Sequence, residues 1–204
     1  MAKVHNYSAG PCILDESVLK EAQAAVGNFD NLDLSLLEIS HRSKNFVAVM
    51  DEATALVKEI LNVPEGYSVL FLQGGASLGF LITVMNLMRE NGKAAYTDTG
   101  AWANKAIKEA KLFGDVNVLG TSKDANYNFI PKDYTVPSDI DYFHCTSNNT
   151  IYGTQMKSFP ECLVPLVCDM SSDIFSKSVD ISQFDMIYAG AQKNLGPAGA
   201  TLYI

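Results

Sequence analysis

Lys193 is the residue whose surroundings point most directly to chemistry. It lies among small and turn-forming residues that follow the apolar segment from Phe184 to Tyr188, which we interpret as a short buried strand. A lysine held in such a loop, rather than in a charged cluster, is suited to a lowered pKa and to Schiff-base formation. The alternative is an ordinary surface lysine. Three further candidates, each at another strand end, favour the chemical interpretation.

Asp169 is the first of these candidates, and it closes the apolar stretch that begins at Leu163. The stretch reads as a buried strand, and Pro165 within it indicates an imperfect or edge strand. An aspartate at this end could face a cationic ligand. Pyridoxal phosphate requires such a carboxylate to keep its ring nitrogen protonated. The alternative is an aspartate that caps a helix or forms an Asx turn.

The second candidate is the turn 73–77, with the sequence Gln-Gly-Gly-Ala-Ser. It separates a predicted strand over residues 67–72 from an apolar segment over residues 78–88 that is long enough for a helix. A strand, a glycine turn and a helix start together provide free backbone N–H groups and the positive end of a helix dipole, which suit an anion. Ser77 could add a hydroxyl donor. Glycines also occur in such turns for steric reasons alone.

Trp102 is the third candidate and the only tryptophan in the chain. It follows the short predicted strand that begins at Ala94, close to the start of a predicted helix. An aromatic side chain there could stack on a flat ring, although packing in a core is the more common role.

With these motifs in place, the chain resembles the phosphoserine aminotransferase family, which are class V, fold-type I enzymes dependent on pyridoxal phosphate. The resemblance runs in order through nearly the whole chain. One departure is Ala76-Ser77, where relatives often have a third glycine and an arginine. The segments that carry the resemblance are Asn6–Pro11, Ile39–Ser43, Gly74-Gly75, Trp102, Asn148–Gly153, Asp169 and Gly190–Gly199.

The resemblance implies an α/β fold of the pyridoxal-phosphate-dependent transferase type I, with a mostly parallel sheet flanked by helices. Residues 1–14 would form an N-terminal arm and residues 15–204 the cofactor-binding large domain. Family members continue beyond this point into a small domain, which this chain does not include. We therefore expect the isolated chain to have little or no turnover, and the missing segment could be a separate polypeptide.

The resemblance also implies a set of contacts with pyridoxal 5′-phosphate. Lys193 would carry the cofactor and move the substrate α-proton, while Asp169 would face the ring nitrogen. The backbone at Ala76 and Ser77 would bind the phosphate. The implied contacts are, in chain order, Ala76, Ser77, Trp102 (ring plane), Thr150 (near the ring hydroxyl, or simply a turn threonine), Asp169, Gln192 (a further phosphate donor) and Lys193.

His41 and Arg42 are the candidates for substrate recognition. Arginine suits bidentate binding of phosphate or carboxylate, and an adjacent histidine can add a donor. The resemblance implies amino transfer between O-phospho-L-serine or 3-phosphohydroxypyruvate and glutamate or 2-oxoglutarate, in serine biosynthesis. It also implies small anionic substrates and a homodimer with shared sites. Without the resemblance, the sequence Ser-His-Arg-Ser over residues 40–43 reads as the polar start of a helix.

Two alternatives stand beside this interpretation. Another class V enzyme, such as an alanine–glyoxylate aminotransferase or a cysteine desulfurase, would share Lys193 and Asp169. The Ser-His-Arg motif argues against both. The other alternative is a catalytically incomplete fragment that at most binds the cofactor.

Composition sets broader limits on function. The chain has 204 residues, of which 48% are hydrophobic, enough for a sizeable core. Its net charge of −8 argues against nucleic-acid and membrane-surface partners. No apolar run reaches membrane-spanning length, and four cysteines without paired spacing indicate a reducing compartment such as the cytoplasm. The three histidines are too scattered to suggest a metal site.

Apolar periodicity predicts alternating helices and strands, with a polar surface excursion over residues 127–138. The helix that follows Ser43 should carry one apolar stripe, and Ser43 should cap it. Several short apolar strands favour a mostly parallel sheet covered on both faces. The predicted helices span residues 15–26, 44–61, 77–88 and 101–113, and the predicted strands 67–72, 94–97, 116–119, 142–145, 163–168, 184–188 and 200–204.

Overall fold

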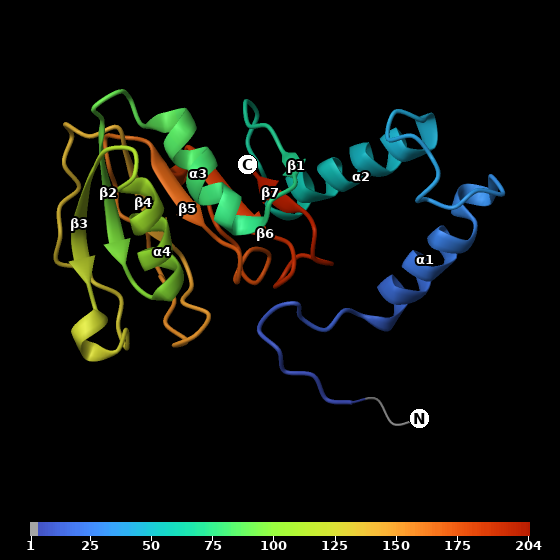
Figure 1. Ribbon diagram of the computed structural model, residues 1–204, viewed down its shortest axis with the longest axis horizontal. Helices are drawn as coiled ribbons and strands as arrows, with labels where there is room; N and C mark the ends of the chain where they lie inside the picture. Colours follow the sequence, from blue (N-terminus) through green and yellow to red (C-terminus); the bar gives the residue numbers. More distant parts are fainter. Residues whose placement is uncertain (1–3) are drawn as a thin grey trace.

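A sheet of seven strands forms the centre of the protein, in the order β1-β7-β6-β5-β4-β2-β3 (Figure 1). Neighbouring strands from β3 to β6 are parallel, whereas β7 is antiparallel to both β6 and β1. The expected mostly parallel sheet is therefore confirmed. The strands are β1 (Leu70–Leu72), β2 (Lys93–Asp98), β3 (Asp115–Thr121), β4 (Tyr142–Thr146), β5 (Leu166–Asp169), β6 (Met186–Gly190) and β7 (Thr201–Tyr203).

The computed structural model describes residues 4–204, so the first three residues of the predicted arm lie outside the described part. All four predicted helices are present, with ends within a few residues of those expected. Ser43 caps α2 as predicted, because its hydroxyl accepts a hydrogen bond from the backbone N–H of Phe46. The helices are α1 (Glu16–Gly27), α2 (Lys44–Ile60), α3 (Gly75–Leu87) and α4 (Ala101–Ala110), with short 3-10 turns η1 (Phe29–Asn31), η2 (Lys123–Ala125) and η3 (Ile181–Gln183).

Helices α3 and α4 cover one face of the sheet, in front of it in Figure 1. Phe80 of α3 and Ile107 of α4 are almost fully buried against strand residues such as Tyr96 and Tyr188. This packing is rigid because the buried tyrosines also pair their hydroxyls: Tyr96 with Tyr142 at 2.7 Å, and Tyr188 with His144 Nε2 at 2.8 Å. The N-terminus of α3 is thereby held at a defined place above the sheet.

The other face of the sheet is covered mostly by irregular segments and by the C-terminal end of α2. The segment 127–138, predicted as a surface excursion, contributes to this cover. It contains no helix or strand, but Tyr134 packs on Phe143 of β4 with ring centroids 5.9 Å apart. The predicted surface excursion thus lies over the sheet, because its few apolar side chains hold it there.

Strand β5 lies in the middle of the sheet, between β4 and β6. Of the two predictions drawn from Pro165, an imperfect or an edge strand, the edge strand is wrong, and the predicted strand is shortened so that it begins after the proline. Pro165 precedes the first residue of β5, and its carbonyl accepts a hydrogen bond from Phe143. A proline lacks only the N–H, so it is compatible with a central strand when it stands just before the strand begins.

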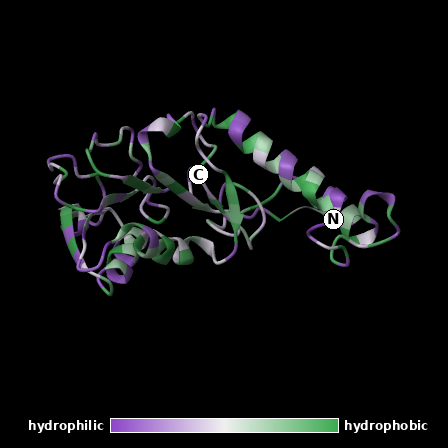
Figure 2. Ribbon diagram, turned by 90° about the horizontal axis from the view of Figure 1, so that it is seen from above, coloured by the Kyte–Doolittle hydropathy of each residue, from purple (hydrophilic) through white to green (hydrophobic). Residues whose placement is uncertain are grey.

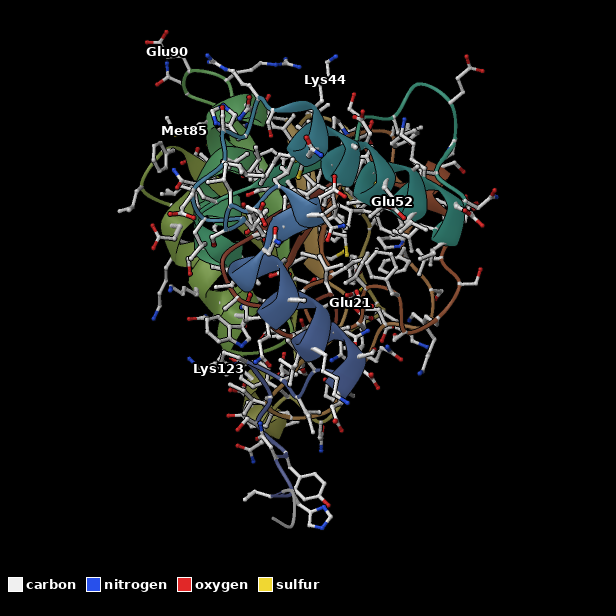
Figure 3. All side chains as sticks on the ribbon, turned by 90° about the vertical axis from the view of Figure 1, so that its right-hand side faces the viewer. Glu21, Lys44, Glu52, Met85, Glu90 and Lys123 are labelled. Atoms are coloured by element: carbon white, nitrogen blue, oxygen red, sulfur yellow. The ribbon has the colours of Figure 1, made fainter. Side chains whose placement is uncertain are left out.

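Helices α1 and α2 project away from the sheet, to the right in Figure 1. No residue of α1 is buried, and Val57 is the only buried residue of α2. Figure 2 shows apolar and polar turns along α2, and Figure 3 shows α1 and α2 from their free end, with Glu21 and Glu52 labelled on them. The predicted apolar stripe of α2 is thus largely uncovered in this chain.

Gly79 provides a test of the contact between α3 and β6. A Cβ at this position would lie 2.7 Å from Cδ2 of Tyr188, whose ring is fully buried and hydrogen-bonded. Because the ring cannot retreat, we expect Gly79→Ala to lower the free energy of unfolding by about 1–3 kcal/mol in urea titrations. Gly27→Ala, where nothing lies within 4 Å, is the control and should change it little. Equal effects of the two changes would contradict this interpretation.

Candidate active site

A cavity of about 140 Å³ lies where the carboxyl ends of β4, β5 and β6 meet the N-termini of α3 and α4. The seven residues predicted to contact a cofactor all line it, although they come from five separate segments of the chain. A larger hollow, of about 470 Å³, lies between residues 129–134 and 154–160 and contains none of them. The cavity is lined by Gly75, Ala76, Ser77, Trp102, Thr146, Asn148, Thr150, Asp169, Ser171, Ser172, Gln192 and Lys193.

The N-terminus of α3 forms one wall of the cavity and has the features of an anion site. Gly74 precedes the helix in a left-handed conformation with φ of 105°, and no side chain caps the first turn. The first backbone N–H groups therefore have no capping partner from a side chain, and no acidic residue lies in that turn. A side chain at Gly74 would also collide with Leu78, so glycine is required for this turn.

Asp169 lies at the end of β5 and is only 4% exposed. Both the backbone N–H and the hydroxyl of Ser171 donate to its Oδ1, at 2.9 and 2.6 Å. Burial raises the pKa of Asp169, while the hydrogen bonds from Ser171 and the charge of Lys193 act in the opposite direction. The carboxylate is thus oriented by Ser171 but only partly compensated for its loss of water.

No ion pair within residues 4–204 includes Asp169. A buried carboxylate without a counter-ion is costly, and a cation bound in the cavity would remove that cost. A protonated pyridine nitrogen is a group of this kind. Sequence reasoning missed Ser171, whose hydroxyl also accepts a hydrogen bond from Gly190 and so connects Asp169 to β6. The only sequence signal was its position two residues after the aspartate.

Lys193 reaches the cavity from the loop after β6. Its Nζ donates to Oγ1 of Thr150 at 2.8 Å and lies 5.2 Å from the ring centroid of Trp102. Burial lowers its pKa, and the negative charge of Asp169 opposes that shift. A lowered pKa increases the fraction of neutral amine, which is the nucleophilic form.

The predicted N-terminal arm also contacts the lysine loop. The backbone N–H of Cys12 donates to the carbonyl of Gln192 at 2.9 Å. A Cβ at Gly10 would lie 3.0 Å from Cγ of Lys193, so the arm passes close to the lysine stem. Sequence reasoning separated the arm from the site, because nothing in the local pattern indicates a contact across this distance in the chain.

Lys105 places a positive charge beside the N-terminus of α3, and sequence reasoning missed this residue as well. Its Nζ donates to the hydroxyl of Ser77 at 3.1 Å and lies 5.8 Å from the Trp102 ring. The available signal was its spacing, because Lys105 is one helical turn from Trp102 on α4. The Ala76-Ser77 departure from the family pattern is thus accompanied by a cation from another helix.

His41 and Arg42 do not line this cavity. Both side chains are exposed, in the segment before α2, and the backbone N–H of Arg42 donates to the hydroxyl of Ser40. The structure therefore brings together the predicted cofactor residues but leaves the predicted substrate residues apart from them in the same chain.

The histidines form no metal site in the described part of the chain, where no cluster of three or more potential metal ligands occurs. His144 of β4 is buried and stacks on Tyr96 with ring centroids 4.7 Å apart. Burial lowers its pKa to about 3, so the ring is neutral at physiological pH. Its role is to hold Tyr188 in the core.

Comparison with known proteins agrees with the geometry of the site. Residues 4–204 match the family described as aminotransferase class-V, and the chain belongs to that family. It is 66% identical over 203 residues to the phosphoserine aminotransferase of Flavobacterium psychrophilum, covering 99% of this chain and 57% of that relative. The chain thus spans little more than half the length of the curated relatives that it matches.

Solved structures give the same result. The phosphoserine aminotransferase from Bacillus circulans subsp. alkalophilus superposes with a TM-score of 0.93 at 47% identity, over 97% of this chain and 56% of that one. The pyridoxal-phosphate-bound phosphoserine aminotransferase from Trichomonas vaginalis has a TM-score of 0.91 at 34% identity, over 99% and 58%. The expected fold is confirmed. No helix in residues 4–204 has the length and apolar character needed to span a membrane.

The raised pKa of Asp169 predicts how its replacement changes stability. The folded chain holds this proton more tightly than the unfolded chain, so the free energy of unfolding falls as pH rises above the ordinary value of 3.8. In the cofactor-free chain, Asp169→Asn should therefore raise Tm at pH 7 in calorimetry. The difference should disappear below the ordinary pKa, where both forms are uncharged.

A control of opposite sign is Asp180, whose pKa is lowered by hydrogen bonds from Ser182. Its ionised form stabilises the fold above its ordinary pKa, so Asp180→Asn should give no gain at pH 7. A Tm of Asp169→Asn below that of the unchanged chain at pH 7 would contradict the proposed cost of the buried charge.

Proposed function

We propose that the protein catalyses pyridoxal-phosphate-dependent amino transfer between O-phospho-L-serine or 3-phosphohydroxypyruvate and glutamate or 2-oxoglutarate, a reaction of serine biosynthesis. The observation that carries this proposal is the meeting of Lys193, Asp169 and the uncapped N-terminus of α3 in one cavity. Relatives at 55–66% identity named phosphoserine aminotransferase support it.

The residues of the cavity fit pyridoxal phosphate. The first turn of α3 and Gln192 provide donors for a phosphate, with Lys105 nearby as a cation. Asp169 provides the buried anion that a pyridinium nitrogen needs. Trp102 offers an aromatic face, and Thr150 lies within hydrogen-bonding distance of the lysine amine. When bound, the cofactor supplies a reactive aldehyde and an electron-withdrawing ring.

Lys193 has two roles in this proposal. Its amine, whose pKa is lowered by burial, would hold the cofactor, and Nζ would then be placed to accept and return a substrate α-proton. The hydroxyl of Thr150 holds Nζ on the Trp102 side of the cavity. Asp169 would stabilise a positive charge on the group held in the same cavity, so the two residues would act on one bound cofactor.

The first test concerns the covalent attachment. The purified chain with pyridoxal phosphate should absorb in the near-violet, and borohydride reduction should leave the mass of the cofactor on the peptide that contains Lys193. Lys193→Ala should lose both signals. Lys111→Ala, which removes an exposed lysine at the end of α4, should retain both. Label on another lysine, together with a yellow Lys193→Ala variant, would refute the assignment.

We further propose that the enzyme is a homodimer in which His41 and Arg42 complete the site of the partner subunit. Their exposure, and their separation from the cavity of their own chain, support this arrangement. So do the uncovered apolar side chains of α1 and α2, such as Leu19, Val49 and Ile60. The four free cysteines suit a reducing compartment, and we propose the cytoplasm.

Arg42 should determine substrate preference. In the protein extended to the full length of its relatives, Arg42→Ala should weaken the binding of phosphoserine and glutamate far more than that of alanine. Only the first two substrates carry a distal anion. Loss of a desolvated charged contact costs roughly 2–5 kcal/mol, so tens- to thousands-fold increases in KM are expected. Equal losses for alanine and phosphoserine would indicate a defect in folding or cofactor binding instead.

A mixing experiment tests the shared site. At the full length of the relatives, Lys193→Ala should be inactive with phosphoserine and Arg42→Ala strongly weakened. Activity should recover when the two proteins are unfolded and refolded together, because some dimers then hold one intact site. Absence of recovery in mixed dimers of confirmed composition would show that Arg42 acts in its own chain or not at all.

A further inference from the structure

We propose that Asn149 is a positioning residue that fixes Trp102 relative to Thr150 and thereby sets the width of the cavity. Asn149 does not line the cavity and is only 3% exposed. It lies beside Thr150 in the loop after β4, directly against the turn that leads from β2 into α4. This inference rests on the proposed function only in taking pyridoxal phosphate as the ligand of the cavity.

The side chain of Asn149 bonds to the turn before Trp102. Its Nδ2 donates to the carbonyl of Thr99 at 2.6 Å. The next residue, Gly100, is the N-cap of α4, and its carbonyl accepts the hydrogen bond from the backbone N–H of Asn104 that closes the first turn. A Cβ at Gly100 would lie 2.6 Å from Nδ2 of Asn149, so the amide fills the space left by the glycine. The N-terminus of α4, which carries Trp102, therefore packs against the Asn149 amide and is hydrogen-bonded to it through Thr99.

The backbone of Asn149 is itself held firmly in its own loop. Its N–H donates to the carbonyl of Thr154, and its carbonyl accepts from Gly153, both at 2.8 Å. Its Oδ1 accepts a bond from the N–H of Tyr152 at 3.4 Å. The amide thus projects from a closed loop, and any movement of the Thr99 carbonyl is resisted by that loop.

The neighbouring Asn148 forms the corresponding connection on the opposite side. Its Nδ2 donates to the hydroxyl of Ser172 at 2.9 Å, and its carbonyl accepts from that hydroxyl at 3.2 Å. Ser172 follows Asp169 by three residues. Thr150 is thereby tied toward Asp169 through Asn148 and toward Trp102 through Asn149. Two adjacent asparagines, hydrogen-bonded in opposite directions, therefore set the separation between Trp102 and Asp169 across the cavity.

Removal of the Asn149 amide leaves a buried carbonyl without this donor. Thr99 is 1% exposed, so water does not readily replace the lost bond in the present arrangement. The Thr99 carbonyl can regain a partner if the turn shifts toward solvent, and α4 begins two residues later, at Ala101. We therefore expect the loss to appear at Trp102, rather than only as a general loss of stability.

Because Trp102 is the only tryptophan of the chain, its fluorescence reports on this position without labelling. In the cofactor-free chain, Asn149→Ala should shift the emission to longer wavelength and increase quenching by acrylamide. Asn149→Asp preserves the shape of the side chain but removes the donor, and it should give the same change. Gly100→Ala, which pushes against the amide from the other side, should give it too.

The affinity for pyridoxal phosphate gives a second measurement. Titration followed by quenching of Trp102 should show binding about tenfold weaker in Asn149→Ala, which corresponds to about 1.4 kcal/mol. Inorganic phosphate needs only the N-terminus of α3, so it should compete equally well in the unchanged chain and in Asn149→Ala. Failure of the unchanged chain to bind pyridoxal phosphate would count against the proposed function, whereas the emission of the cofactor-free variants tests Asn149 independently.

Two controls separate positioning from general destabilisation. Asn128→Ala removes an exposed asparagine amide, and Ile181→Val loosens the core on the opposite face of the sheet. Both should leave the Trp102 emission unchanged, even if Ile181→Val lowers Tm. Unchanged emission and affinity in a folded Asn149→Asp or Asn149→Ala chain would overturn the proposal. So would an equal emission change in Ile181→Val.

Discussion

Asp169 places a carboxylate in the interior at the end of β5, with 4% of the residue exposed and no ion partner in the described part of the chain. Such a group destabilises the cofactor-free protein unless something compensates it. Here the compensation within the chain is limited to hydrogen bonds from Ser171 and the more distant charge of Lys193. The remaining cost of the buried charge would be reduced by a cation bound in the cavity, such as the protonated ring of the proposed cofactor.

The sheet makes this arrangement possible because parallel strands end at the same edge. The ends of β4, β5 and β6 deliver Thr150, Asp169 and Lys193 to one place, although these residues are distant in sequence. The buried packing of Phe80 and Gly79 against Tyr188 then holds the N-terminus of α3 over that edge. The N-terminus of α3 and the carboxylate of Asp169 are therefore held in place by the same core.

Hydrogen bonds between loops complete the site. Ser171 connects the Asp169 turn to β6, and Asn148 and Asn149 connect the Thr150 loop to its two neighbours. These bonds are made by buried or half-buried polar side chains, whose cost of desolvation is recovered only in this one arrangement. The cavity is thus shaped by Asn149, which does not line it, as well as by Ser171 and Asn148, which do.

The sequence by itself determined the helices and strands, the order of the chemical motifs and the type of each reactive residue, because these depend on local periodicity, turn chemistry and side-chain identity. The Ser43 cap and the α2 helix are examples. Only the tertiary structure decided that Pro165 precedes a central strand, that residues 127–138 cover the sheet, and that Ser171, Lys105 and Asn149 support the site. It also separated His41 and Arg42 from the cavity. These outcomes depend on contacts between distant segments, whose energies come from burial and from hydrogen bonds that no local pattern records.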